Sequence, residues 1–144
     1  MSDSSAHRVP RAGLDPITDA DTALAVIHLA VHEPPEPATI VVTLDHRRCG
    51  IHLAVITRTS SDDDVIDIVE RLLGGIEPDD EIDAIVLATV RPGSQGSCEH
   101  DIERWSMIDD VAYEFGIELV DWFVLGDTIW SPRDLAGVPP RWEP

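Results

Sequence analysis

The sequence predicts one α/β domain, a mixed β-sheet flanked by helices, and three observations predict it. First, runs of β-branched residues alternate with helical patterns. Second, proline and glycine separate most of these runs. Third, 43% of the 144 residues are hydrophobic. A chain of this length can bury a core without disulfides or metals. The predicted order is α-β-β-α-β-α-β-β, and because strands alternate with helices only in part, we expect a mixed sheet.

In the first half, residues that oppose regular structure mark where the helices end. Proline cannot donate a backbone hydrogen bond and disfavours a helical residue before it, so the prolines within 34–37 end the first helix. Gly74-Gly75 ends the second helix, which Ser60 or Ser61 caps. The predicted elements are a mobile arm at 1–14, a helix that begins after 15–16, paired strands at 39–44 and 51–57 around a turn at 46–50, and a helix up to residue 73.

The second half alternates between strand and helix patterns. An almost unbroken apolar run follows the second helix, as in a strand buried on both faces. Gly116 ends the next helix, and Gly126-Asp127 forms a turn before the last strand. The predicted elements are strands at 82–90, 117–125 and 128–131, a helix at 100–115, and an irregular tail at 132–144, which leaves 15–131 as the folded domain.

The charge of the chain argues against one class of partner. There are 28 acidic residues against 10 arginines and no lysine, which gives a formal net charge of -18. Such a surface repels phosphate backbones, so nucleic-acid binding is not expected, whereas basic partners are favoured. The adjacent Arg47 and Arg48 are expected to be solvated turn residues.

The sequence also predicts a cellular compartment. No apolar run approaches the length that spans a bilayer, and the first residues lack the pattern of a signal peptide, so we expect a cytoplasmic protein with no membrane association. Two cysteines, Cys49 and Cys98, make no disulfide framework, and both are expected to be thiols.

Three segments carry a resemblance to a known family. They are Thr43-Leu44-Asp45-His46-Arg47-Arg48, Asp83-Ala84-Ile85-Val86-Leu87-Ala88, and the stretch from Asp101 to Asp127, which contains Gly116-Ile117-Glu118-Leu119-Val120-Asp121 and Val124-Leu125-Gly126-Asp127. With these segments, residues 38–131 resemble the RadC-like branch of the JAB/MPN metalloprotease fold. The spacing from Asp101 to Gly116 is the family's own. The resemblance implies the cytidine-deaminase-like architecture of that fold.

The resemblance also implies a zinc site, from which this sequence departs. Active members of the family hold zinc with two histidines and an aspartate, which leaves one position for a water molecule. Asp101 matches the aspartate, but Thr89 and Arg91 stand where the histidines would be. Shifting the alignment of this loop with the family pattern by one residue places Ala88 and Val90 at the histidine positions instead. Neither alignment supplies a histidine.

Two further family positions are changed. Cys98 replaces the serine three residues before the aspartate, and the proton-handling glutamate is missing, since no Glu lies between Asp45 and Glu70. Threonine binds zinc weakly and arginine repels it. The resemblance therefore implies no catalytic residue, no metal and no cofactor, and vestigial metal-site positions at Thr89, Arg91, Cys98 and Asp101.

Arg91 has two interpretations. It pairs with Asp101 and fills the empty metal position, or it points into solvent and neutralises nearby acids. We favour the ion pair, because a carboxylate left unmatched in a buried site costs free energy.

Two catalytic alternatives stay open. Zinc held by Cys98, His100 and Asp101, with or without Cys49 and His52 of the hairpin, would make the chain a metallohydrolase of the JAB isopeptidase or peptidase kind. Cys98 paired with His100 would be a nucleophile, because a helix N-terminus lowers a thiol pKa, although the neighbouring acids oppose this effect.

The favoured hypothesis is a catalytically inactive RadC-like JAB/MPN domain that serves as a protein-interaction or scaffold module. By analogy, inactive members of the fold act as partners of other proteins. Trp142, between Arg141 and Glu143 in the tail, is the interaction candidate, because tryptophan often anchors interfaces. It either folds back on the domain or is left for a partner. The sequence indicates no oligomeric state.

Overall fold

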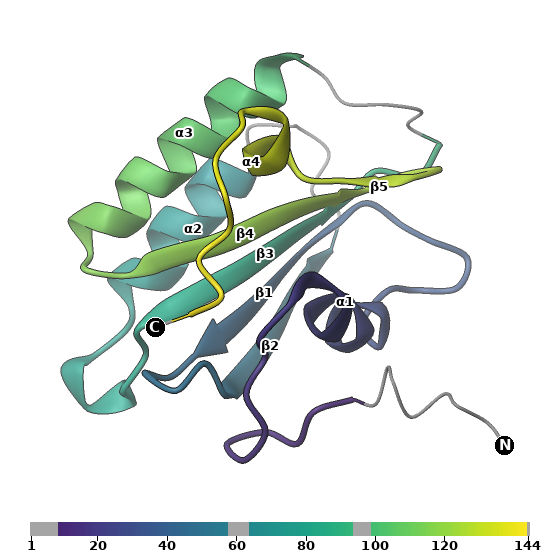
Figure 1. The fold of residues 1–144 in the computed structure, drawn as a ribbon. Helices are drawn as coiled ribbons and strands as arrows, with labels where there is room; N and C mark the ends of the chain where they lie inside the picture. Colours follow the sequence, from purple (N-terminus) through teal and green to yellow (C-terminus); the bar gives the residue numbers. More distant parts are fainter. Residues whose placement is uncertain (1–8, 58–63, 94–98, 144) are drawn as a thin grey trace, which may run out of the picture.

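A five-stranded mixed sheet forms the middle of the molecule (Figure 1). The computed structural model describes residues 9–57, 64–93 and 99–143. None of the helices in these ranges combines the length and the hydrophobicity of a transmembrane segment. The α/β class with a mixed, helix-flanked sheet is confirmed. The elements are α1 (Ala20–His28), β1 (Ala38–Leu44), β2 (Gly50–Thr57), α2 (Asp64–Gly74), the 3-10 helix η2 (Pro78–Asp80), β3 (Ala84–Val90), α3 (Glu99–Glu114), β4 (Glu118–Leu125), β5 (Ile129–Trp130) and α4 (Pro132–Leu135).

The sheet mixes antiparallel and parallel pairs. Its strand order is β2-β1-β3-β4-β5. β1 pairs antiparallel with both β2 and β3, and β4 pairs antiparallel with β5. Only β3 and β4 are parallel, with α3 as the crossover between them. This crossover brings the end of β3, the end of β4 and the beginning of α3 to the same edge of the sheet.

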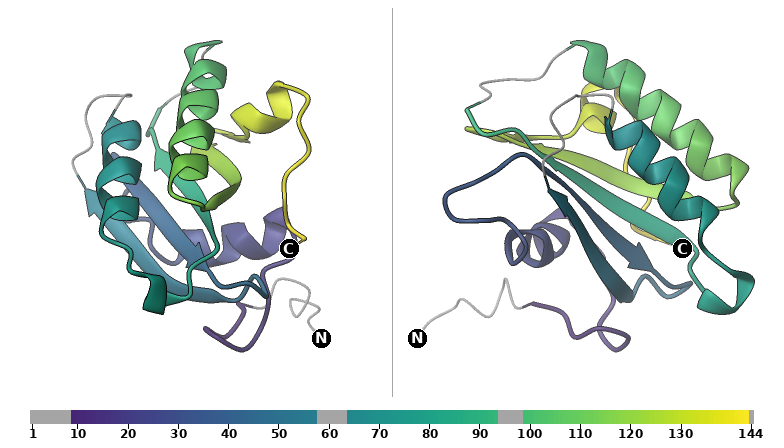
Figure 2. Two further views of the ribbon diagram at one scale, coloured as in Figure 1. Left: turned by 90° about the vertical axis from the view of Figure 1, so that its left-hand side faces the viewer. Right: turned by 180° about the vertical axis from the view of Figure 1, so that it is seen from behind.

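Helices cover both faces of the sheet, α2 and α3 on one face and α1 on the other (Figure 2). Each face buries its own hydrophobic cluster. Ile27 and Ile40 belong to the cluster on the α1 face, and Ile108 and Trp122 to the cluster under α2 and α3. Because side chains alternate across a strand, β1 and β3, which are buried along their whole length, contribute to both clusters. This double burial explains the nearly continuous apolar run at 82–90.

The helix starts differ from the expected ones. α1 begins at Ala20 rather than directly after Pro16, because Asp19 is the N-cap and accepts a hydrogen bond from the backbone N–H of Thr22 at 2.8 Å. The expected cap of α2 at Ser60 or Ser61 lies outside the described residues. α2 ends at Gly74, one residue beyond the predicted end.

The segment 132–144, expected to be irregular, begins with the short helix α4. Ser131 caps this helix by accepting a hydrogen bond from the N–H of Asp134 at 3.2 Å, and Pro132 stands at its first position, where a missing N–H costs nothing. α4 packs against α3 and β4. The chain then runs back along β4 (Figure 1), where the N–H of Arg141 donates to the carbonyl of Val120 at 3.2 Å.

The turn between β1 and β2 holds a correction. Arg47 is exposed as expected, but Arg48 is buried, with 2% of its surface accessible. Its guanidinium donates to the carboxylate of Glu118 and to the carbonyls of Arg141 at 3.3 Å and Glu143 at 3.4 Å. The expectation of a solvated pair was wrong for Arg48, because β4 and the returning tail supply acceptors that no local pattern reveals.

Two glycines at helix ends should respond oppositely to alanine. Gly116 follows α3 with φ of 74°, where a Cβ is strained, whereas Gly74 ends α2 without positive φ and an added Cβ would meet nothing closer than 3.9 Å. We expect Gly116→Ala to lower the free energy of unfolding by about 1 kcal/mol, and Gly74→Ala to leave it unchanged or raise it slightly. Urea denaturation measures both changes, and equal effects would contradict this assignment.

Candidate functional site

The candidate site lies at the edge of the sheet where the parallel strands end. Ligand sites of α/β proteins usually occupy the carboxyl ends of such strands. Arg91 directly follows β3, and its backbone N–H donates to the carbonyl of Leu125 at the end of β4, at 2.8 Å. Asp101 lies in the first turn of α3. The crossover therefore places a fixed arginine opposite a fixed carboxylate.

Arg91 and Asp101 form a bidentate ion pair. Nη1 of Arg91 donates to Oδ2 of Asp101 and Nη2 donates to Oδ1, both at 2.8 Å. Arg104, one turn further along α3, donates from Nη1 to Oδ1 at 3.1 Å. The Asp101 side chain is 0% exposed, and that of Arg91 is 13% exposed. The hypothesis that Arg91 pairs with Asp101 is confirmed, and Arg104 is a partner that the sequence reasoning missed.

This arrangement matches the geometry of the guanidinium to that of the carboxylate. Two parallel N–H···O bonds form the strongest of the common side-chain pairings and fix both planes. Burial makes the pair costly to break, because the remaining partner would keep an uncompensated charge in a site of low dielectric. The second arginine satisfies a further lone pair of the carboxylate. Asp101 is thus held by cations that belong to the protein itself.

Thr89, the other expected vestigial position, has a structural partner. It lies near the end of β3 and is buried, and its Oγ1 accepts a hydrogen bond from Nε1 of Trp122 at 2.9 Å. Trp122 is fully buried on β4 beneath α2 and α3. The threonine therefore satisfies the only polar atom of a core tryptophan, which would otherwise lack a partner in the hydrophobic cluster.

The residues at this position do not fit the zinc ion that the resemblance implies. A catalytic zinc needs three protein ligands of the His, Cys, Asp or Glu type. Here one position is a threonine bound to Trp122, the second is a cation, and both oxygens of Asp101 accept hydrogen bonds from arginine. Within the described ranges, no three such ligands are gathered at any point. A metal at Asp101 would have to displace two guanidinium groups.

Of the alternative zinc ligands, His100 and Asp101 lie within the described part of α3, and their side chains differ in exposure. His100 has 64% of its side chain exposed and lies 3.5 Å from Glu103, whereas its neighbour Asp101 is fully buried. Consecutive helical residues face different directions, so this divergence is built into the helix. Cys98, the third ligand of that alternative and the proposed nucleophile, lies outside the described residues.

The hairpin ligands are separated from Asp101 by the length of β3. Cys49 is buried in the turn before β2, and His52 pairs with Thr43, which in turn pairs with Ile85 near the beginning of β3. Arg91 follows the opposite end of that strand. A site that joins Cys49 and His52 to Asp101 does not form, because the hairpin approaches the wrong end of β3. Burial raises the pKa of the Cys49 thiol, which opposes ligation as a thiolate.

A second buried carboxylate, Asp121 on β4, fastens β5 and α4 to the sheet. Its Oδ1 accepts hydrogen bonds from the hydroxyl of Ser131 at 2.7 Å and from the N–H of Trp122 at 2.8 Å. Burial is the main cause that raises the pKa of Asp121, and these two hydrogen bonds and nearby Arg133 oppose the rise. Sequence reasoning treated Asp121 only as part of the family pattern.

Trp142, the interaction candidate, is folded back on the domain. Its ring stacks on Phe123 with centroids 6.4 Å apart and an interplanar angle of 20°, and it packs against the hydrophobic cluster on the α1 face. Arg48 binds the carbonyls on both sides of it. Of the two alternatives left open by the sequence, the structure shows the docked one, with Trp142 half-buried.

Comparison with protein-family models and with curated proteins finds no match to this chain.

Removing Arg91 should destabilise the fold more than removing Arg104. Arg91→Ala leaves Asp101 buried without its two-bond partner, and we expect the free energy of unfolding to fall by about 3 kcal/mol. Arg104→Ala removes one longer bond from a carboxylate that stays paired, and a loss of about 1 kcal/mol is expected. Chemical denaturation of both variants at neutral pH tests this order. Equal losses, or a larger loss for Arg104→Ala, would contradict it.

The contribution of Asp121 to the free energy of unfolding should decrease as the pH rises. Because its pKa is raised in the folded protein, the folded state holds the proton more tightly than the unfolded state, and this advantage is lost between pH 3.8, the ordinary value, and the raised folded pKa. Asp121→Asn keeps an oxygen that accepts from Ser131 and Trp122 but does not titrate. We expect the variant to gain stability relative to wild type over that pH interval, measured by denaturation at a series of pH values.

The matched control is Asp110→Asn on the exposed side of α3, which removes the same charge from a solvated site. Stability curves for Asp121→Asn and wild type that run parallel over the whole series would show that burial of this carboxyl does not act as described.

Proposed function

We propose that this chain is a non-catalytic domain of the RadC-like JAB/MPN type that acts through contacts with other proteins. The observation that carries the proposal is the bidentate pair of Arg91 and Asp101. The guanidinium of Arg91 occupies the position at which the JAB/MPN family, which the chain resembles, holds a metal ion. Asp101, the carboxylate that would bind zinc, instead joins α3 to the end of β3.

The surroundings of the pair support the same interpretation. Thr89 is committed to Trp122, and Arg104 adds a second cation beside Asp101. A general base for a bound water would have to be a carboxylate or histidine within hydrogen-bond reach of the reacting atoms. Among the described residues at this position, Asp101 is the carboxylate, and it is fully buried and paired with two arginines, so it is not placed to take a proton from a bound water.

The acidic surface supports protein contacts over nucleic-acid contacts. The formal net charge is -18, with arginine as the only cation. Long-range fields of this sign speed encounters with basic proteins and slow encounters with phosphate backbones. The competing function is the zinc-dependent metallohydrolase with Cys98, His100 and Asp101 as ligands, and metal content separates the two.

Metal analysis tests the proposal. The full chain, expressed in zinc-supplemented medium and purified without chelator, should contain almost no zinc by plasma mass spectrometry, and added zinc should not protect it against thermal unfolding. Asp101→Asn is the matched control, and it should also contain almost no zinc and gain no thermal protection from added zinc. About one equivalent of zinc in the wild type, lost in Asp101→Asn, would overturn the proposal and favour the hydrolase, since a genuine site couples metal binding to folding.

A further inference from the structure

The outer edge of β2 is an unpaired strand edge along most of its length in the described part of the chain. β2 is the outermost strand on its side of the sheet. The segment before α1 pairs with its beginning, where the N–H of Gly13 donates to the carbonyl of Gly50 at 2.9 Å and Pro16 forms a bridge with Cys49. Residues 9–12 of this segment line the adjoining cavity together with residues 51–53 of β2. From Ile51 to Thr57, no other strand in the described ranges pairs with this edge.

β2 lacks the devices that usually protect an edge. Its sequence, GIHLAVIT, contains no charged residue and no proline, although lysine, proline and inward charges are the common means by which exposed strands avoid new partners. The one irregularity in its pairing lies at its beginning, opposite Thr43 and Leu44. The rest is a regular strand that is able to accept another strand.

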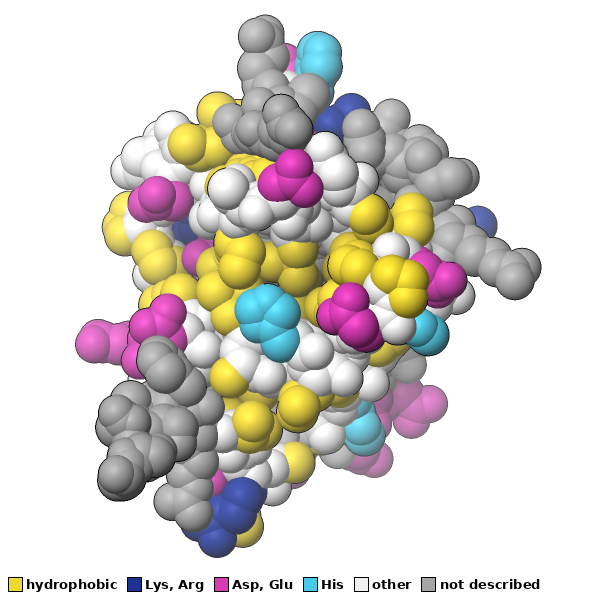
Figure 3. Space-filling model, turned by 90° about the vertical axis from the view of Figure 1, so that its right-hand side faces the viewer, with side chains coloured by type: hydrophobic (Ala, Val, Ile, Leu, Met, Phe, Trp, Pro, Cys, Tyr) yellow, Lys and Arg dark blue, Asp and Glu magenta, His cyan; other side chains and the backbone are white. Residues whose placement is uncertain are grey.

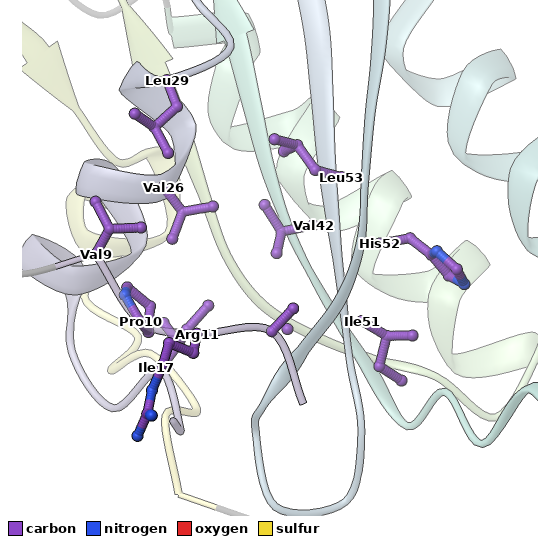
Figure 4. Close-up of a pocket in the computed structure, with 12 residues that line it drawn as sticks. Val9, Pro10, Arg11, Ile17, Val26, Leu29, Val42, Ile51, His52 and Leu53 are labelled. Carbon is purple, nitrogen blue, oxygen red and sulfur yellow. The ribbon is translucent and has the colours of Figure 1, made fainter. Parts of the chain in front are cut away.

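A hydrophobic groove adjoins this edge on the α1 face. Leu53 and Val55 are 42% and 40% exposed, and they pair with Val42 and Ile40, which belong to the core under α1. The adjoining cavity has a volume of about 200 Å³. Figure 4 shows Val26 and Leu29 of α1 on one side of it and Val42 and Leu53 of the sheet on the other.

Charge around the groove favours a cationic occupant. At the Thr57 end of β2, Glu36 is 60% exposed and lines a hollow with Thr57 and His32, and its Oε2 lies 4.0 Å from Nδ1 of that histidine. At the other end, the two exposed cations are already matched, Arg11 by Asp15 and Arg47 by Asp45. Figure 3 shows hydrophobic side chains gathered on one face of the molecule with acidic side chains among and around them. A second copy of the chain would bring a further charge of -18, which opposes self-association.

We propose that the open edge of β2 and the adjoining groove bind an extended segment of a partner protein, which adds to the sheet as a sixth strand. Main-chain hydrogen bonds to β2 would supply affinity, and alternate aliphatic side chains would enter the groove beside Leu53 and Val55. Lysine or arginine stands at the end of the segment that lies beside Thr57 and Glu36. This inference rests on the proposed role in protein contacts and names its surface and its partner class.

A synthetic peptide tests the proposal directly. The probe is a fluorescein-labelled eight-residue peptide with two lysines followed by alternating valine and threonine, titrated with the full chain and followed by fluorescence anisotropy. We expect a dissociation constant in the range of about 10–100 µM, and at least tenfold weaker binding when both lysines are replaced by glutamate. Raising the salt concentration should weaken the binding of the lysine peptide.

Two pairs of matched variants locate the binding. Leu53→Arg puts a cation into the groove, and Met107→Arg adds the same charge at an exposed position on α3. Leu53→Arg should weaken binding by about tenfold or more, as loss of a central anchor does, and Met107→Arg should not. Glu36→Gln should weaken binding by a factor of about 3, and Glu114→Gln at the end of α3 should weaken it less. Circular dichroism confirms that each variant is folded.

Three results would overturn the proposal. The first is no binding at concentrations up to about 1 mM, the weakest affinity that a specific contact would show here. The second is equal binding by wild type and Leu53→Arg. The third is a dimer in sedimentation equilibrium that Leu53→Arg dissociates, because the occupant of β2 would then be a second copy. Zinc content is measured separately. If the chain contains no zinc and does not bind the peptide, the proposed binding surface on β2 is wrong, but the proposed non-catalytic role is not contradicted.

Discussion

The pairing of Arg91 with Asp101 is the interaction on which the candidate site depends. It joins the end of β3 to the beginning of α3 across the one parallel crossover of the sheet. Desolvation of a fully buried carboxylate costs several kcal/mol, and only well-aligned opposite charges offset that cost. The position at which α/β folds usually present a ligand site is therefore closed by an arginine of the chain itself.

Buried arginines organise the rest of the molecule in a similar way. Arg48 binds the carbonyls that flank Trp142, and Arg133 donates to the carbonyl of Pro139 at 2.8 Å while its guanidinium lies 5.4 Å from the centre of the Trp105 ring. The planar guanidinium has five donors in a fixed arrangement and can satisfy several backbone acceptors at once, whereas the lysine ammonium has three. Burial lowers the pKa of Arg133, so its neighbours must compensate for the desolvation of its charge. The tail is consequently part of the folded domain.

The fold class and most elements followed from the sequence because their signals are local. Double burial of β3 produces an apolar run, and Gly116 marks the end of α3 by its left-handed conformation. The start of α1 was misplaced, because several acidic residues compete as caps near Asp19. The short helix α4 was missed, although Ser131-Pro132 is a readable start signal. Membership of the JAB/MPN fold stays a prediction.

The site was predictable only in part, for a physical reason. The pairing of Arg91 with Asp101 was predictable because a carboxylate left unmatched in a buried site costs free energy. Arg104, one turn from Asp101, was available from helical spacing and was overlooked. The roles of Arg48 and Arg133 depend on carbonyls that arrive from distant segments, and no periodicity in the sequence reports such contacts.

A double-mutant cycle measures how much Arg91 and Asp101 stabilise the fold through each other. Arg91→Met, Asp101→Leu and the double variant remove each charge and then both, and urea denaturation at neutral pH gives the four free energies of unfolding. We expect a coupling energy of about 2 kcal/mol or more, with the double variant more stable than the sum of the two single losses allows. A coupling energy below about 0.5 kcal/mol, the level found for independent positions, would contradict it.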